Sequence, residues 1–411
     1  MNRRPWWRAR VGAGLPWDGR TGGRALAAAL MFALALAAAP ALAALLDFSA
    51  DERAAILRHG PWPPPPAADA GNALSGRPAA IALGQRLFFD PRLSPGSVAC
   101  AHCHRPDLAF GDGRARSQGL AELDRNAPAL WNAVHERWLA WDGAADSLWS
   151  QAIRPLLDAR EMASSPARVQ ATIAADRELA CRFRQATGRA VTEVDAETVL
   201  VDAAKAIGAF VATLVSPRTP FDDFRDALAR GDRRAAARYP LAAQRGLRLF
   251  VGRGNCALCH GGARFSNGEF ADIGLPFFTR PGQVDPGRHG GIEALRASPY
   301  NRLSRWAEGA DATPTRHVQA QHRNFGEFKV PSLRHVALTA PYMHDGQLAT
   351  LADVVRHYST LNPERLHADG EQILRPLALS EAEQADLVAF LRTLTPRGGM
   401  AWQPSRGPAC R

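Results

Sequence analysis

Two five-residue motifs of the form Cys-x-x-Cys-His constrain this chain more than any other feature. The first runs from Cys100 to His104 and the second from Cys256 to His260. In such a motif the two thiols reach the two vinyl groups of one haem, and the adjacent imidazole then lies beneath the iron. The motifs predict two covalently attached c-type haems, held by Cys100, Cys103, His104, Cys256, Cys259 and His260.

Two other interpretations of the cysteine pairs fit the sequence less well. A zinc site built from both pairs would place them close together in sequence, and it would not need a histidine after each pair. A redox-active dithiol of the thioredoxin type requires a βαβ context, but strand-like alternation is almost absent from this chain. Two haems therefore explain the motifs better than a zinc ion or a dithiol.

Two cysteines lie outside the motifs. Cys181 falls in a helical pattern and is expected to be a small, buried apolar side chain. Cys410 is one residue from the C-terminus, where chains are commonly poorly ordered. A disulfide between these two cysteines is the alternative, although nothing in the sequence requires it.

Residues 1–43 have the form of a secretory signal. Six arginines precede an uncharged apolar run from Ala25 to Ala43, which ends in Ala41-Leu42-Ala43. This order is typical of a signal peptide cleaved after Ala43, so we expect export to the periplasm and no membrane span in the mature chain. An uncleaved membrane anchor is the alternative, because the run is close to the length that spans a bilayer.

The formal net charge of +10 at pH 7 comes in large part from this leader, which holds six arginines and one aspartate. The rest of the chain is mildly basic, which favours solubility. No stripe of basic residues interleaved with aromatic residues is present in the sequence, so nucleic acid is not an expected partner.

Apolar residues three or four positions apart predict a mainly α fold. The predicted helices cover residues 79–89, 146–158, 166–187, 195–214, 350–358 and 380–394, with Asp195 and Ser380 as N-terminal caps. A Gly-x-Arg-Leu-Phe pattern precedes each cysteine pair. It covers Gly84 to Phe88 before the first pair and Gly246 to Phe250 before the second. We therefore expect two homologous cytochrome-c-like haem domains with long loops.

The expected domain limits follow from composition and from this repeat. After the leader, a Pro-rich N-terminal linker covers residues 44–78. Over residues 59–78 we expect either an extended linker or a segment that wraps around the fold, and no helix. The N-terminal haem domain covers residues 79–235, the C-terminal haem domain 236–396, and a tail 397–411. Residues 279–323 are the least regular stretch, and a loop of this length is usually either functional or disordered.

Further motifs surround the cysteine pairs. They are Arg125-Asn126-Ala127-Pro128, Trp141-Asp142-Gly143, Phe328 to Arg334 and Leu338 to Gly346. Together with both haem motifs, they make residues 79–396 resemble the bacterial di-haem cytochrome c peroxidases and their relative MauG, which matures methylamine dehydrogenase. Taken together, these motifs are highly specific to that family.

The resemblance implies different roles for the two haems. The haem next to His104 would bind hydrogen peroxide, and the haem next to His260 would transfer electrons or store oxidising equivalents. Peroxide chemistry needs an acid and a base at the open iron position. By resemblance the distal pocket contains Gln151, Pro155 and Glu161, of which Glu161 is the only carboxylate.

The resemblance also concerns the region between the haems. Trp141 matches a tryptophan that relays electrons there, whereas Trp131, Trp138 and Trp149 are expected to be core residues. Family members bind a calcium ion between the haems, and the matching ligands are the Asn126 side chain and the carbonyls of Thr339 and Pro341, with waters completing the shell. Without the resemblance, Asn126 would be taken for an ordinary turn residue.

Two positions decide the branch of the family. In many di-haem peroxidases a histidine after the first haem motif blocks the peroxide iron until the enzyme is reduced. Here residues 105–134 contain no histidine, and Gln118 stands near the expected position. The resemblance to MauG therefore implies an N-terminal haem that is open from the start.

The second position follows His344 and holds methionine in those peroxidases. This chain has Tyr358 there, as MauG does, and a phenolate stabilises higher oxidation states of iron. The resemblance implies Tyr358 as an axial ligand of the C-terminal haem. The alternative is that Tyr358 only continues the apolar helix face of Leu351, Val354 and Val355.

The haem motifs and the resemblance together imply an oxidoreductase that reduces hydrogen peroxide with electrons from a protein donor, such as a cytochrome c or a cupredoxin. One alternative is a MauG-like enzyme in which the peroxide-derived high-valent haem oxidises residues of a partner protein. Another is a non-catalytic di-haem electron carrier, against which the open N-terminal iron argues. The sequence leaves the donor, the protein substrate and a homodimer open.

Overall fold

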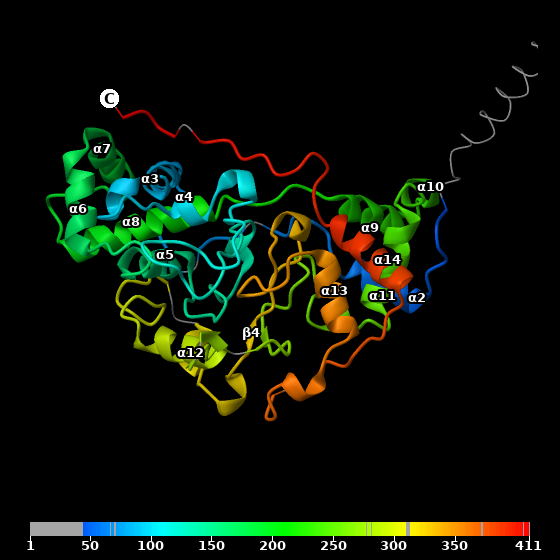
Figure 1. Cartoon of the computed structure of the whole chain (residues 1–411). Helices are drawn as coiled ribbons and strands as arrows, with labels where there is room; N and C mark the ends of the chain where they lie inside the picture. The colour runs from blue at the N-terminus through cyan, green and yellow to red at the C-terminus, as the bar shows by residue number, and fades with distance from the viewer. Residues whose placement is uncertain are drawn as a thin grey trace, which may run out of the picture. The chain divides into compact units, whose positions relative to one another are not determined.

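The computed structural model describes residues 44–65, 67–69, 71–276, 278–280, 282–309, 313–370, 373–405 and 407–410. Residues Leu45–Arg411 form one compact unit (Figure 1). The predicted signal peptide lies outside the described residues. Within the described ranges, no helix is long and apolar enough to cross a membrane.

The first of two hydrophobic cores is built around α8 (Ala196–Val211), which is buried along almost its whole length. Helices α3 (Pro78–Phe88), α5 (Leu148–Leu157) and α6 (Pro166–Ala175) pack against it. At Gly84 of α3, an added Cβ would lie 1.8 Å from the carbonyl oxygen of Ala206. Only glycine permits helices to approach so closely. Trp131, Trp138 and Trp149 are buried, as expected for core residues.

The second core repeats this arrangement. Helix α11 (Leu241–Val251) packs against α14 (Glu381–Arg392), and α2 (Ala50–Leu57), α9 (Pro220–Arg230), α10 (Arg233–Ala236) and α13 (Leu351–Ser359) surround them. An added Cβ at Gly246 would lie 2.0 Å from the carbonyl oxygen of Asp386. The glycine of the sequence repeat therefore serves the same close helix contact in both cores. Figure 1 shows the two helix groups, with α3 and α8 in one and α11 and α14 in the other.

Most predicted helices form, and Asp195 and Ser380 cap α8 and α14 as expected. The prediction of one helix over 166–187 is wrong, because α6 ends at Ala175 and α7 covers Arg177–Thr187. Asp176 between them has an extended backbone, and its side chain accepts the N–H groups of Glu178 and Leu179. An aspartate in this cap position starts a new helix.

The segment predicted as a Pro-rich linker starts with a helix that sequence analysis missed. Ile56 of α2 is fully buried in the second core. Downstream, the Nε1–H of Trp62 donates to the carbonyl of Ser216 at 2.9 Å. The Asp69 carboxylate then accepts the backbone N–H groups of Leu148 and Trp149 at the start of α5, at 2.6 and 3.1 Å. This segment therefore wraps from the second core to the first.

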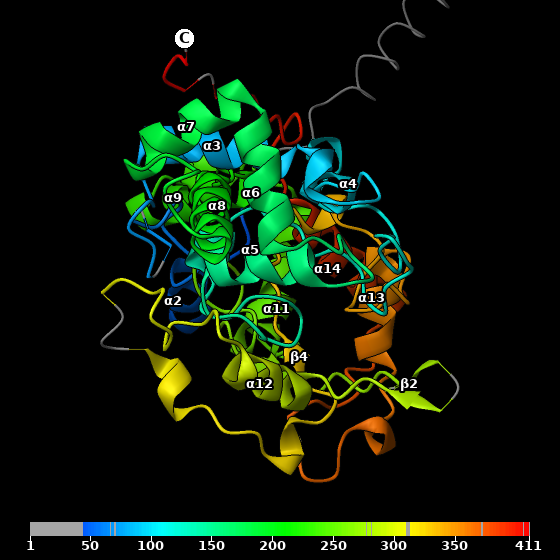
Figure 2. The same ribbon diagram turned by 90° about the vertical axis from the view of Figure 1, so that its left-hand side faces the viewer.

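Strands are few among the described residues, as predicted. β1 (Phe270–Ala271) pairs antiparallel with β4 (Phe328–Lys329), and β2 (Phe278–Arg280) pairs with β3 (Gln283–Val284). The stretch 279–323 also contains α12 (Arg288–Ala297). In Figure 2 the β2–β3 hairpin projects to one side and α12 lies below α5. The described part of this stretch therefore contains short regular elements joined by loops.

Short helical turns connect these elements. They are η1 (Pro91–Leu93), α4 (Cys100–Cys103), η2 (Pro106–Leu108), η3 (Ala133–His135), η4 (Cys256–Leu258), η5 (Pro314–His317), η6 (His322–Asn324), η7 (Val336–Leu338) and η8 (Pro363–Arg365). Cys100 and Cys103 are the first and last residues of α4, whereas Cys256 begins η4 and Cys259 directly follows it. The two cysteines of each motif are therefore presented from one turn of helix.

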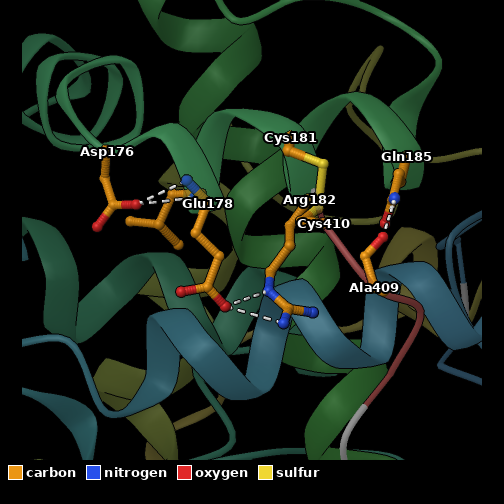
Figure 3. Close-up of a disulfide and its surroundings, with 8 residues drawn as sticks. Asp176, Glu178, Cys181, Arg182, Gln185, Ala409 and Cys410 are labelled. Atoms are coloured by element: carbon orange, nitrogen blue, oxygen red, sulfur yellow. Dashed lines mark hydrogen bonds and ion pairs between the residues drawn. A yellow bond between two sulfur atoms is a disulfide. The ribbon is translucent and has the colours of Figure 1, made fainter.

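The C-terminal tail returns from α14 to the first core (Figure 1). Trp402 stacks on Phe89 with 5.2 Å between ring centroids, and Cys410 forms a disulfide with Cys181 of α7, 229 residues away (Figure 3). The expectations of a buried apolar Cys181 and a poorly ordered Cys410 are therefore wrong. The disulfide, which the sequence left as an alternative, is formed.

The limits of the two haem domains remain predictions. Helix α9 precedes residue 236, yet its Phe221 and Phe224 belong to the second core. The packing therefore favours a boundary before α9.

Candidate active site

Both Cys-x-x-Cys-His motifs line one cavity of about 1680 Å³. Pockets for a single small molecule commonly measure about 300–1,000 Å³, so this cavity has room for more than one such group. Its lining includes the cysteines and histidines of both motifs, together with Gln151, Glu161, Trp141 and Tyr358. The structure thus brings the predicted catalytic and haem-binding residues together around one space.

The first motif presents a histidine suited to bind iron. Cys100 and Cys103 occupy the single turn of α4, and His104 follows it. The Nδ1–H of His104 donates to the carbonyl of Phe110 at 3.0 Å, which fixes the tautomer with Nε2 as the metal-binding nitrogen. Burial lowers the pKa of His104, so the ring is held neutral as a ligand must be.

The second motif repeats this geometry. The Nδ1–H of His260 donates to the carbonyl of Phe265 at 3.0 Å, and burial lowers the pKa of His260 to about 4. His59, from the wrapping segment, lies behind the motif with its Nε2 3.2 Å from the carbonyl oxygen of His260. Thiols on one turn, a neutral imidazole and a large adjoining cavity fit a covalently attached haem at each motif.

The predicted distal residues come from α5 and the loop after it. Gln151 and Pro155 are four positions apart in α5, so they lie on one face of the helix, and both line the cavity. The Oε1 atom of Gln151 is buried and has no hydrogen-bond partner among the described residues. Burial, and secondarily the nearby Asp158 carboxylate, raises the pKa of Glu161 to about 7. A carboxyl group with this pKa exchanges protons at neutral pH.

The loop that contains Gln118 borders the cavity, because Gly119 belongs to the lining, whereas Gln118 does not. The backbone N–H groups of Leu120 and Ala121 donate to the carbonyls of Glu161 and Arg160, at 3.0 and 2.9 Å. Gln118 itself is exposed, and its Nε2 donates to the carbonyl of Gly119. The side chain at this position therefore does not enter the cavity.

Trp141 links residues of the two halves of the chain. Its indole Nε1–H donates to Oδ1 of Asn126 at 2.9 Å, and its carbonyl accepts the backbone N–H of Lys329 at 2.8 Å. Lys329 is buried and forms an ion pair with Glu136. These contacts hold the indole at the lining of the cavity that both motifs share.

Two of the three predicted calcium ligands lie together. The Asn126 amide nitrogen donates to the carbonyls of Pro341 and Met343 at 3.2 and 2.9 Å, while the Thr339 hydroxyl donates to the carbonyl of Val336. A cation would need the amide oxygen where the nitrogen lies. Exchange of the two ends of the amide meets this need, and the Trp141 Nε1–H then donates to the Asn126 backbone carbonyl at 3.1 Å instead of to Oδ1. The resulting set of oxygen atoms suits calcium.

Tyr358 lies on the face of α13 that lines the cavity with Leu351 and Val355. The two expectations for Tyr358 are therefore compatible, because the apolar face of the helix is also the face toward the cavity. Burial, and secondarily the nearby thiols of Cys256 and Cys259, raises the pKa of the phenol. A phenol ionises in such a place only when a metal stabilises the anion.

Comparison with known proteins agrees with this geometry. Residues 78–230 match a family model described as di-haem cytochrome c peroxidase. The methylamine utilization protein MauG of Methylorubrum extorquens is 38% identical over 320 residues, which are 77% of this chain and 78% of that protein. The cytochrome-c peroxidase IdrP2 of Pseudomonas sp. (strain SCT) is 33% identical over 330 residues, 79% of this chain and 83% of that protein.

The chain belongs to the family of MauG and the di-haem cytochrome c peroxidases. A solved structure of a MauG-like protein associated with microbial copper homeostasis is 29% identical, with a TM-score of 0.62, and the match covers 83% of this chain and 96% of that one. This family carries two c-type haems and catalyses peroxide-dependent oxidation. The chain is therefore a di-haem oxidoreductase that uses peroxide.

Sequence analysis missed one set of residues that surround Trp141 in this member of the MauG and peroxidase family. Arg288 of α12 donates to the carbonyls of Asp142 and Gly143, next to Trp141. Asp285 forms a bidentate ion pair with Arg125, with hydrogen bonds of 2.7 and 2.6 Å, and Arg125 also donates to Asp142. The motifs Arg125-Asn126-Ala127-Pro128 and Trp141-Asp142-Gly143 were visible, but their partners lie in the irregular stretch 279–323.

Proposed function

We propose that this protein is a periplasmic peroxidase that reduces hydrogen peroxide at the haem of Cys100, Cys103 and His104. Electrons come from a protein donor, such as a cytochrome c or a cupredoxin, through the haem of Cys256, Cys259 and His260. The observation that carries this proposal is the single cavity lined by both motifs and by Glu161. A non-catalytic electron carrier would need no acid and base there.

Each distal residue has a stated role in this proposal. A haem with an open coordination position supplies the two-electron cleavage of the peroxide bond. The Glu161 carboxylate takes the first proton of hydrogen peroxide and returns it to the departing oxygen. The Gln151 amide, whose Oε1 has no protein hydrogen bond among the described residues, holds the peroxide by hydrogen bonding.

Trp141 and the calcium ion belong to the region between the haems. The indole of Trp141 carries electrons from one haem to the other. Asn126, with the carbonyls of Thr339 and Pro341, binds calcium and positions this indole through the hydrogen bond from Trp141 Nε1–H to the Asn126 backbone carbonyl, 3.1 Å. The proposal is supported by the contact of Asn126 with the Pro341 carbonyl.

Two observations support a periplasmic location of the protein. The leader has the order of a signal peptide, and disulfides such as Cys181–Cys410 persist in oxidising compartments. Cytosolic thiols are normally kept reduced.

A second candidate function is MauG-like oxidation of residues in a partner protein. Tyr358 on the cavity lining and the exposed Gln118 favour it, because MauG has tyrosine at the matching position and an open N-terminal haem. The relative from Methylorubrum extorquens is itself a methylamine utilization protein.

Steady-state turnover separates the two candidates. The purified di-haem protein is mixed with hydrogen peroxide and either reduced cytochrome c or reduced cupredoxin, and oxidation of the donor is followed by absorbance. The peroxidase proposal predicts many turnovers with at least one donor, and loss of turnover in Trp141→Phe. Trp306→Phe is the control, since this tryptophan is not part of the cavity lining. Single-turnover behaviour with every donor would contradict the peroxidase and favour the MauG-like enzyme.

A further inference from the structure

Three potential metal ligands meet on the surface at the edge of the cavity. His322 belongs to η6 at the end of the irregular stretch, and His367 and Asp369 follow η8 in the C-terminal half. Their ligand atoms all lie within 4.8 Å of one another. His322 Nδ1 is 2.8 Å from Oδ2 of Asp369, and the two imidazole rings are 5.0 Å apart between centroids.

The local backbone fixes each ligand. Around His322, the backbone N–H of Gln321 donates to Oδ1 of Asn324 at 2.9 Å and closes the turn. The backbone N–H of His367 donates to Oδ2 of Asp272 at 2.7 Å, which fixes the backbone of His367. Nδ1 of His367 accepts the backbone N–H of Asp369 at 3.3 Å, and a metal bound at Nδ1 would replace this long contact. The three side chains are thus presented from two anchored turns, which limits the ordering that metal binding requires.

The cluster is distinct from the haem sites. Its three members are not part of the cavity lining, whereas their neighbours Asn324 and Ile373 are. His322 and Asp369 are mostly exposed, with side-chain exposures of 73% and 63%. An exposed histidine–aspartate pair contributes little stability by itself, so stability gives no reason for two histidines and a carboxylate to converge here.

We propose that His322, His367 and Asp369 bind one divalent late first-row transition-metal ion, Cu²⁺ or Zn²⁺. Two imidazole nitrogens and one carboxylate oxygen suit these ions, whereas calcium and magnesium prefer oxygen ligands alone. Affinity at such a site follows the order in which Cu²⁺ exceeds Zn²⁺. Three protein ligands leave a coordination position for water or for a group of another molecule.

The bound ion would join two segments that are far apart in sequence. The first is the stretch that carries α12, and the second is the loop after α13, the helix of Tyr358. His357 on α13 is also tied to this region, because its Nε2 donates to the carbonyl of Ile273 at 2.8 Å. Metal binding therefore braces the edge of the cavity, independently of which donor or substrate the enzyme uses.

Metal content of the tag-free holoprotein tests this site. The protein with both haems is stripped with chelator and dialysed separately against Zn²⁺ and Cu²⁺, and bound metal is counted per chain. In the holoprotein the motif cysteines are bonded to haem, and Cys181 and Cys410 form a disulfide, so free thiols do not compete. Calorimetric titration with Zn²⁺ gives the affinity, and unfolding temperature with and without Zn²⁺ is a second readout.

The proposal predicts one equivalent of metal and a rise in unfolding temperature. His322→Gln and His367→Gln each weaken binding by more than about tenfold, because even groups that only orient metal ligands have effects of that size. His317→Gln, an exposed histidine outside the cluster, leaves binding unchanged. Absence of stoichiometric binding, or equal loss in His317→Gln, would overturn the site. Haem content and peroxide reactivity stay normal in all variants, so failure here does not affect the proposed function.

Discussion

The Nη1 atom of Arg288 lies 2.8 Å from the carbonyl oxygen of Gly143 and 3.1 Å from that of Asp142. Arg288 is 4% exposed, and its guanidinium lies over the rings of Phe270 and Trp138, at 4.0 and 4.7 Å from their centroids. Burial lowers the pKa of Arg288 to about 10, so it stays charged at neutral pH. Helix α12 therefore supports the loop that holds Trp141.

We predict that Arg288→Ala destabilises the protein by about 3 kcal/mol, because buried carbonyls lose a charged donor. Trp141 also loses its fixed position, so electron exchange between the haems slows. Denaturant unfolding and rapid mixing with a reductant measure the two effects. Arg296→Ala on the exposed side of the same helix is the control, with an expected change below about 0.5 kcal/mol. Equal rates of electron exchange in Arg288→Ala and wild type would refute the positioning role.

Tyr358→Phe removes the proposed axial ligand. An anionic phenolate stabilises oxidised iron, so its loss raises the reduction potential of the C-terminal haem and changes its visible spectrum. Spectroelectrochemistry measures both quantities. Tyr239→Phe, in the second core and outside the cavity lining, leaves both unchanged. If the spectrum of Tyr358→Phe equals that of wild type, Tyr358 is not a ligand.

The pKa of Glu161 sets the pH dependence of the reaction with peroxide. Only the carboxylate accepts a proton, so with a pKa of about 7 the rate should rise about tenfold from pH 6 to pH 8. Glu161→Gln lowers the rate about 100-fold or more and removes this dependence. Asp158→Asn shifts the midpoint to lower pH, because the Asp158 charge contributes to the raised pKa. Stopped-flow measurements give the rate of the reaction with peroxide across this pH range. A wild-type rate that does not change with pH would contradict the role of Glu161 as the base.

The raised pKa of Glu161 also makes the free energy of unfolding depend on pH. Glu161 has a higher pKa in the folded protein than the ordinary value of 4.5, so its contribution to stability is complete below pH 4.5 and is lost as pH rises through about 7. Compared with wild type, Glu161→Gln should therefore gain stability at pH 8 relative to pH 5. Unfolding free energies at the two pH values measure this gain, and no gain would indicate that the carboxyl group is not buried.

Asp69 shows how the wrapping segment supports the active site. Its carboxylate is buried and accepts the first N–H groups of α5, the helix that carries Gln151. Asp69→Ala leaves buried N–H groups unpaired and should cost about 2–3 kcal/mol. Asp195→Ala, at the exposed cap of α8, should cost about 1 kcal/mol. Urea denaturation measures both, and equal losses would argue against a special role of Asp69.

Local patterns predicted much of this molecule from sequence. The haem motifs, the glycine repeat and most helices depend on spacings within a few residues. The remaining features depend on contacts between distant segments. Cys410 forms a disulfide with Cys181, 229 residues away. Arg288, in a stretch without clear periodicity, donates to the carbonyl of Gly143. Helix α2 was not predicted because its apolar face is narrow, with Ala55 and Ile56 as its buried residues.

We infer that the N-terminal haem is open in the oxidised protein, because Gln118 is not part of the cavity lining and Glu161 is. The most direct measurement is stopped-flow absorbance after one equivalent of hydrogen peroxide is added to the fully oxidised protein, without any reductant. We predict an immediate spectral change that is about 100-fold or more slower in Glu161→Gln. If the wild-type protein reacts with peroxide only after prior reduction, the N-terminal haem is not open in the oxidised protein.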